Sequence, residues 1–217
     1  MIHITDVLNK KLSKIGSTLS FDKESNEIGE QIAYENIEDR SIEIIRFPKE
    51  KEIWVSFRYQ SVSLPSLNSS DIEKITKIVF EFLELKISLN DFFGNYIKSP
   101  IDISNLANDK EILLELSWFN FLQPSQYDHL GPKEHIILRE FAKAIESIAK
   151  AKKLNPYWSH TRLCFTLDRK FKTGNFPSIW VSSQEKEIPI FTIVDYDGVK
   201  LSSGTAEEIK DIFKEII

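Results

Sequence analysis

Three aspartates come nearest to forming a catalytic metal site in this chain. Asp195 and Asp197 lie on one side of an expected strand end, in the sequence DYDG, and Asp168 ends a strand that could be a neighbour. Clustered carboxylates can hold Mg²⁺ and promote phosphodiester cleavage. The pair Asp197-Gly198 is also a sufficient signal for a hairpin turn. We favour the turn, and keep a small metal-dependent hydrolase or nuclease using Asp168, Asp195 and Asp197 as an alternative.

Histidine and cysteine give weaker signals. If residues 160–164 are extended, His160 and Cys164 share a face but stand about 13 Å apart, too far for a nucleophile and its base. We therefore interpret Cys164 as a small buried residue. His129 and His135 flank a turn, HLGPKEH, whose spacing matches no common metal site. Pro132 explains this segment as the start of a helix.

The basic segment DRKFKTGN, residues 168–175, combines positive charge with Phe171 and could grip a nucleic acid. A solvated hairpin turn is the alternative, and the acidic balance of the whole chain favours it. The chain contains no GxxxxGK[ST], GxGxxG, GxSxG, HExxH or paired CxxC motif. We expect a protein without catalytic activity, cofactor or bound metal, and no nucleic-acid partner.

Composition predicts a cytoplasmic protein. With 217 residues, 41% of them hydrophobic, the chain can build one large domain or two small ones. No apolar run approaches the roughly 18 residues of a membrane helix, and the first 16 residues lack the features of a signal peptide. A single cysteine excludes an intramolecular disulfide. Frequent Lys, Ile, Asn and Glu residues are typical of an AT-rich bacterial genome.

The first half of the chain reads as a helix, a strand meander and a second helix. A helical period covers 4–15, and Gly16 stands where a glycine would end it. Ser70 and Glu73 form a capping-box pattern at the start of a helix over 69–86. Between the helices, alternating runs predict four short strands, at 17–21, 28–37, 41–47 and 53–60.

The second half repeats this order. A short helical turn is expected over 89–100, and 109–124 fits either helix or strand, with helix favoured. A clear helix follows over 131–154. Strands are expected at 161–167, 176–183 and 187–196, and Thr205 with Glu208 forms a second capping box before the last helix.

The predicted fold class is therefore α+β, with antiparallel strand meanders flanked by helices and the order helix–strands–helix occurring twice, around 1–87 and 131–217. We expect two halves, 1–100 and 101–217, packed as one compact unit. Both halves contain the sequence IWVS, at 53–56 and 179–182. A common origin of the halves is a hypothesis.

The two IWVS tryptophans receive different interpretations. Trp54 shares a strand face with Ser56, Arg58 and Gln60, which indicates a rim position. Trp and Arg are the residues that most often anchor protein interfaces. The strand after Trp180 is apolar on both faces, which predicts that Trp180 lies in the core between sheet and helix.

Charge is divided unevenly along the chain. Residues 22–43 carry a net charge of −6, and residues 133–172 carry +6. These are two solvated or mutually facing surfaces, or the first is an acidic face for a basic partner. The candidate partner-binding residues are Trp54, Arg58, Tyr34, Glu27, Glu30 and Glu35.

These features favour a cytosolic protein that binds another protein and has no membrane partner. The concrete hypothesis is a bacterial immunity protein that neutralises a toxin, which could be basic. The order expected over 1–87, an amphipathic helix, a strand meander and a helix, resembles the opening of type III secretion chaperones. Those proteins are acidic and hold effectors unfolded on a sheet surface. The resemblance covers under half of the chain and implies a secretion-effector chaperone as the alternative.

Overall fold

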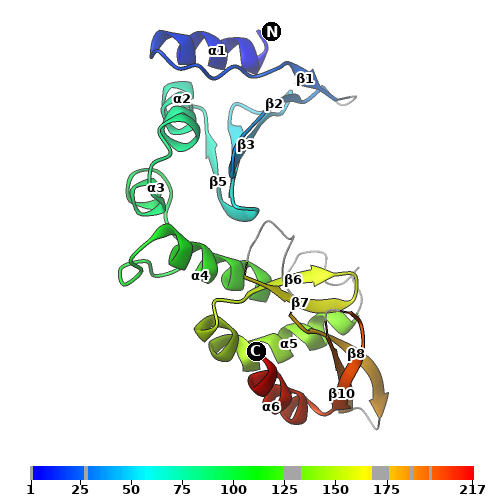
Figure 1. Ribbon diagram of the computed structural model, residues 1–217. Coiled ribbons are helices and arrows are strands. Elements are labelled where there is room, and N and C mark those ends of the chain that lie inside the picture. Colours follow the sequence, from blue (N-terminus) through cyan, green and yellow to red (C-terminus); the bar gives the residue numbers. More distant parts are fainter. Residues whose placement is uncertain (1, 27–28, 125–132, 168–175, 186–187, 196) are drawn as a thin grey trace. The chain divides into compact units, whose positions relative to one another are not determined.

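The computed structural model describes residues 2–26, 29–124, 133–167, 176–185, 188–195 and 197–217. The chain divides into two compact units, Met1–Leu113 and Leu114–Ile217. Each unit contains one five-stranded antiparallel sheet, which we call sheet A in the first unit and sheet B in the second. The predicted α+β class, with antiparallel meanders flanked by helices, is confirmed (Figure 1).

The first unit begins with α1 (Ile4–Lys14) and continues into sheet A, whose strands neighbour one another in chain order. Three helical segments follow the sheet: α2 (Ile72–Val79), the π-helical segment η1 (Phe80–Glu84) and α3 (Leu89–Asn95). The strands are β1 (Glu24–Ser25), β2 (Gln31–Ile37), β3 (Arg40–Arg46), β4 (Ile53–Tyr59) and β5 (Val62–Ser69).

The second unit has the same kind of order. Residues 109–122 form α4 (Asp109–Leu122), so the helix that was favoured over 109–124 is confirmed. The division between the units falls within α4. α5 (Lys133–Ala151) follows. Sheet B has the order β10-β9-β8-β7-β6, and α6 (Ala206–Ile216) ends the unit. Its strands are β6 (Asn155–Ser159), β7 (Arg162–Thr166), β8 (Ser178–Glu185), β9 (Ile188–Val194) and β10 (Lys200–Gly204).

Helix ends follow local chemistry. Gly16 adopts φ +79°, and the N–H groups of Gly16 and Ser17 donate to the carbonyls of Ser13 and Leu12. This is a Schellman motif, and it ends α1 where the sequence predicts. The second predicted capping box is also present, with the Thr205 N–H donating to Glu208 Oε2 at 2.8 Å.

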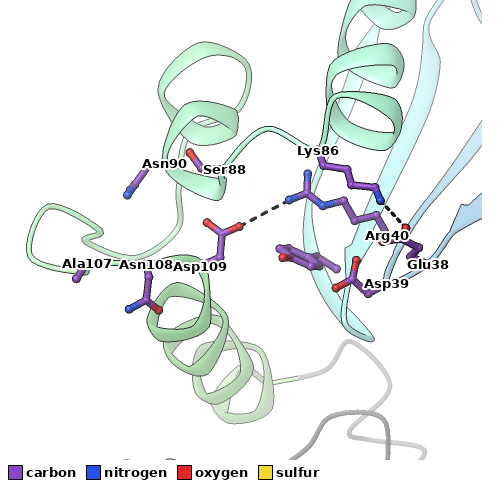
Figure 2. A pocket seen from close by; sticks show the side chains of 10 residues that line it. Glu38, Asp39, Arg40, Lys86, Ser88, Asn90, Ala107, Asn108 and Asp109 are labelled. Atoms are coloured by element: carbon purple, nitrogen blue, oxygen red, sulfur yellow. Dashed lines mark ion pairs between the residues drawn. The ribbon is translucent and has the colours of Figure 1, made fainter. Parts of the chain in front are cut away.

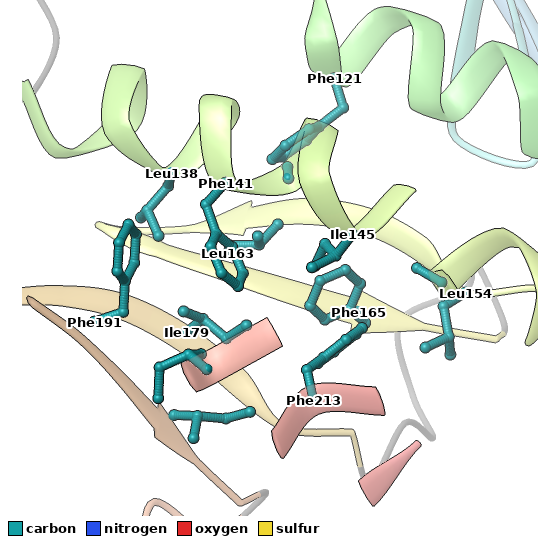
Figure 3. Close-up of a cluster of buried hydrophobic side chains, with 14 of the residues drawn as sticks. Phe121, Leu138, Phe141, Ile145, Leu154, Leu163, Phe165, Ile179, Phe191 and Phe213 are labelled. Atoms are coloured by element: carbon teal, nitrogen blue, oxygen red, sulfur yellow. The ribbon is translucent and has the colours of Figure 1, made fainter. Parts of the chain in front are cut away.

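One face of each sheet packs under helices. In the first unit, Phe57 of β4 packs edge-on against Phe82 of η1 and Phe92 of α3, with ring centroids 5.4 and 5.1 Å away, and α1, α2 and α3 lie on one side of sheet A (Figure 1). In the second unit, Phe165 of β7 packs against Phe213 of α6 and Trp118 of α4. Figure 3 shows this second core, and α4, α5 and α6 contribute side chains to its helical side.

Two predictions in the first half are wrong. Residues 17–21 are not a strand, because the Asn9 side chain binds both backbone groups of Phe21, at 2.9 Å each, and takes the place of a neighbouring strand. The capping box at Ser70 and Glu73 is absent. Asp71 is the N-cap instead, and its Oδ1 accepts the N–H groups of Glu73 and Lys74 at 3.0 Å.

Strands β1, β5, β6 and β10 were not predicted. β5 and β6 each contain a proline, which weakens the strand signal. β5 is an edge strand, and Pro65 lies where its register with β4 shifts. Gln60 and Ser61, both with positive φ, make the turn before β5. That turn conformation usually carries Asn-Gly or Asp-Gly, so its sequence signal is missing here.

Candidate protein-binding site

The side of sheet A opposite the helices brings together three of the predicted binding residues. In one row across the sheet, Ile32 lies opposite Ile45, and Ile45 lies opposite Trp54. We call this surface the open face. It is defined by the side chains of Ile32, Tyr34, Glu43, Ile45, Trp54 and Arg58.

The polar groups of Trp54, Tyr34 and Arg58 have no hydrogen-bond or ion-pair partner among the described residues. Tyr34 is 51% exposed, Arg58 is exposed and Trp54 is half-buried. Within the described part of the chain, the Trp54 indole N–H, the Tyr34 hydroxyl and the Arg58 guanidinium have no hydrogen bond or ion pair. Strand geometry separates Trp54 and Arg58 by about 13 Å along β4. The surface is therefore broad enough for several side chains of a partner.

The predicted acidic residues lie apart from this face. Glu35 alternates with Tyr34 and shares a row with the buried Ile42, and its Oε1 accepts the backbone N–H of Asn36 at 3.0 Å. Glu30 is half-buried near the start of β2 and bonds to Asn26. Glu27 lies outside the described residues. The acids therefore border the β2 edge of the sheet.

The prediction for Trp180 is wrong. Ile179 and Val181 belong to the core under the helices, so Trp180 points to the opposite face of sheet B, where it is half-buried. The Arg162 guanidinium lies over its indole ring, 4.6 Å from the ring centroid. The prediction assumed that both faces of sheet B are covered, because β9 has apolar residues on both of its faces. The second face of sheet B contains two buried residues, Thr192 and Val194, but Trp180 is only half-buried and does not belong to the core cluster.

Two of the three aspartates proposed as metal ligands, Asp195 and Asp197, lie in the turn between β9 and β10. Asp195 Oδ1 accepts the Val199 N–H at 2.7 Å in the turn between β9 and β10, and Asp197 is exposed in the same turn. Gly198, at φ +80°, completes it, as the turn interpretation predicts. Asp168 lies outside the described residues. Among the described residues, no three His, Cys, Asp or Glu side chains gather as metal ligands would.

The cysteine and histidines have structural contacts. Burial raises the pKa of the Cys164 thiol, which disfavours the thiolate that a nucleophile needs. His160 lies in the turn between β6 and β7 at φ +56°, so residues 160–164 are not all extended. His135 stacks on Trp158, and its Nε2 lies 2.8 Å from the His160 carbonyl oxygen. His129 and the segment 168–175 lie outside the described residues.

A pocket of about 480 Å³ in the first unit surrounds a buried arginine that the sequence analysis did not identify (Figure 2). Arg40 is 3% exposed, and its Nη1 donates to the carbonyls of Phe82 (3.0 Å) and Ile87 (2.8 Å), near the end of η1. Its Nη2 lies 3.7 Å from Asp109 Oδ2, and Tyr59 covers the guanidinium.

Charged side chains around this pocket already have hydrogen-bond or ion-pair partners within the first unit. Asp109 Oδ1 accepts the Leu89 N–H at 2.8 Å, and Lys86 pairs with Glu38 at 2.6 Å. Arg40 therefore ties a strand, a helix end and the start of α4 together, and we interpret it as structural. An arginine on the apolar face of a strand, in RSIEII, was the signal that could have found it.

Comparison with known proteins identifies no relative: no protein-family model, no curated protein and no solved structure matches the chain. In the part of the chain that the structure describes, no helix is long and apolar enough to cross a membrane.

Proposed function

We propose that this protein binds another protein through the open face and has no catalytic activity of its own. The observation that carries the proposal is that Trp54, Tyr34 and Arg58 share one face of sheet A. Among the described residues of the first unit, no helix packs on this face (Figure 1), and the polar groups of the three side chains have no hydrogen-bond or ion-pair partner. These three residue types dominate the energetics of protein interfaces, because each combines a large contact area with a polar group.

Charge indicates the chemistry of the partner. The acidic stretch 22–43 contains β1, β2 and most of β3. It therefore forms one side of sheet A, with Glu43 on the open face and other acids along the β2 edge. A basic partner would approach such a surface faster and bind it more selectively than an acidic one. The kind of protein that this supports is a bacterial immunity protein, which masks a basic toxin in the cytoplasm of the cell that makes it.

A secretion-effector chaperone is the second candidate. The observation that favours it is a sheet surface free of helices within a unit of the order helix, strand meander, helix. The two candidates differ in the state of the partner. An immunity protein binds a folded toxin, whereas a chaperone holds an unfolded effector.

The test is co-expression with the product of the adjacent gene in the source bacterium. We expect that product to stop growth of the host when expressed alone, and this protein to restore growth and form a stable complex with it. Trp54→Ala should weaken the complex by about 30-fold, which corresponds to about 2 kcal/mol.

Trp180→Ala is the matched control, because it removes the same residue from the same local sequence in the other unit. It should leave the affinity within about threefold of wild type. Hydrogen exchange of the bound partner separates the two candidates, since a chaperone client stays unprotected. Equal binding by wild type and Trp54→Ala would contradict the role of the open face.

A further inference from the structure

The two sheets have four edges, and three of them carry features that block another strand. β5 contains Pro65 and β6 contains Pro156, and proline cannot donate a hydrogen bond to a ladder. β10 has a register shift between Lys200 and Ser202, which leaves Leu201 as the extra residue of a bulge. Prolines and bulges are the means by which proteins keep sheet edges from pairing.

Among the described residues, no strand pairs with most of β2 at the fourth edge. β1 pairs only with Gln31 and Ile32, and β2, which is described throughout, has neither a proline nor a register shift. A two-residue turn joins Ile37 to Arg40, so these two residues form a hydrogen-bonded pair. By alternation, the backbone groups of Tyr34 and Asn36 point away from β3, toward the open edge.

Two side chains control this edge. The Glu35 carboxylate accepts the Asn36 N–H, which satisfies one edge donor without another strand. Asn9 holds both backbone groups of Phe21. If β1 continued backwards in its register, Phe21 would lie opposite Glu35. Asn9 therefore keeps the chain from pairing along β2, and the edge stays available.

The surroundings of the edge are acidic. Glu30 is partly exposed, and Asp22 and Glu24 are exposed. Glu38 is exposed as well, but it pairs with Lys86. Lys23, which lies between two of these acids, pairs with Asp6 of α1. An extended segment that approaches β2 therefore meets negative charge, which favours a basic segment.

We propose that a basic, extended segment of the partner adds to sheet A as a strand along Ala33–Ile37 of β2. This deepens the proposed function, on which it rests. The Tyr34 side chain lies on the open face, and the Tyr34 backbone groups point to the β2 edge. One partner can therefore contact both surfaces. Backbone hydrogen bonds supply affinity in such strand addition, and side-chain contacts supply specificity.

The test uses three synthetic peptides of alternating valine and a second residue. The second residue is lysine in the first peptide and glutamate in the second. The third peptide is the lysine peptide with N-methyl groups on every backbone amide, which keeps its charge and removes the backbone donors of both of its edges. The intact protein is titrated with each peptide, and amide hydrogen exchange is followed by NMR.

We expect the lysine peptide to bind at least tenfold more tightly than either of the others, and to slow exchange at Tyr34 and Asn36 by at least tenfold. Asn36→Pro, which removes an edge donor that β3 does not use, should reduce this binding tenfold. Glu207→Gln, an exposed charge change on α6, is the control and should not alter it.

Equal binding of the lysine peptide and its N-methylated form would overturn strand addition, because charge alone would then explain the contact. Absence of binding by all three peptides would overturn it as well. Neither result contradicts the proposed function, which is tested separately by growth rescue and by the affinity of Trp54→Ala for the partner. If rescue fails while the lysine peptide still protects Tyr34 and Asn36, the immunity role fails and the edge site remains.

Discussion

The two IWVS strands, β4 and β8, begin alike and end in different environments. In both, the Ile and the Val are directed to a core under helices, and the Trp points to the opposite face of the sheet. If the two residues of β1 are set aside, each is also the third strand of its sheet. In both, a register shift against the following strand comes directly after the Val.

The neighbours across the strands make the difference. Trp54 lies opposite Ile45 and Asn68, and its indole N–H stays free in the described structure. By the register of β7 and β8, Trp180 lies opposite Arg162, whose guanidinium covers its ring. The local sequence thus fixes which way a tryptophan points. Its availability to a partner depends on residues distant in the chain.

The register shifts also differ in detail. In the first unit the extra residue belongs to β5, beside Pro65, and in the second it is Ser182 of β8 itself. A bulge at one position of a pattern can thus be made by either strand of a pair. The common origin of the two halves stays a hypothesis, and the bulges do not share one construction.

The largest expected effects come from removing one core ring in each unit. Phe57→Ala should destabilise the first unit and Phe165→Ala the second, each by about 3 to 5 kcal/mol, because both rings are fully buried. Denaturant unfolding followed by hydrogen-exchange mass spectrometry would assign each loss to its unit. If either substitution unfolded both units together, the division into two independent halves would be wrong.

A smaller contrast compares an arginine from each unit. Arg40→Ala leaves two carbonyls near the end of η1 and the Asp109 carboxylate without their partner, so we expect a loss of about 3 kcal/mol from the first unit. Arg162→Ala removes an exposed cation–π contact and should cost under about 1 kcal/mol. Urea unfolding measures both. Similar losses would show that Arg40 is not the structural centre that its contacts indicate.

Local sequence was sufficient for much of this fold. Helical periods and their end signals predicted α1, α4, α5 and α6, since the apolar stripe and the Gly16 stop act within a few residues. Alternation predicted β2, β3, β4 and β7. The Asn9 contact with Phe21 could not be predicted, because it joins residues 12 positions apart through a side chain. The edge strands β5 and β6 could not be predicted, because their prolines are tolerated only at sheet edges, which a local pattern does not show.

The candidate site was predictable in part. Face alternation placed Trp54 and Arg58 together, and Tyr34 was also a predicted binding residue. The structure places Tyr34 on the same face and adds Ile32 and Ile45 from neighbouring strands. Glu35 was grouped with Tyr34 by sequence, yet adjacent residues of a strand point to opposite faces. The pairing of Arg162 with Trp180 depends on strand register between β7 and β8, which a single sequence does not give.

The smallest expected effect concerns the acid sensitivity of two hydrogen-bonded carboxylates, one in each unit. Glu84 accepts the Thr18 N–H and the Ser17 hydroxyl in the first unit, and Glu208 accepts the Thr205 N–H in the second. These hydrogen bonds hold the pKa of each carboxyl below its usual value of 4.5. The stabilisation is therefore complete above pH 4.5 and is lost as the pH falls further.

At pH 7, Glu84→Gln should destabilise the first unit and Glu208→Gln the second. The difference in free energy of unfolding between each variant and wild type should become smaller as the pH falls from 5 to 3. Hydrogen exchange at both pH values would show the change separately in each unit. A gap that stayed constant with pH would mean that the carboxylate charge contributes nothing beyond the hydrogen bonds that glutamine can also accept. Because the two carboxylates belong to different units, each variant is the control for the other.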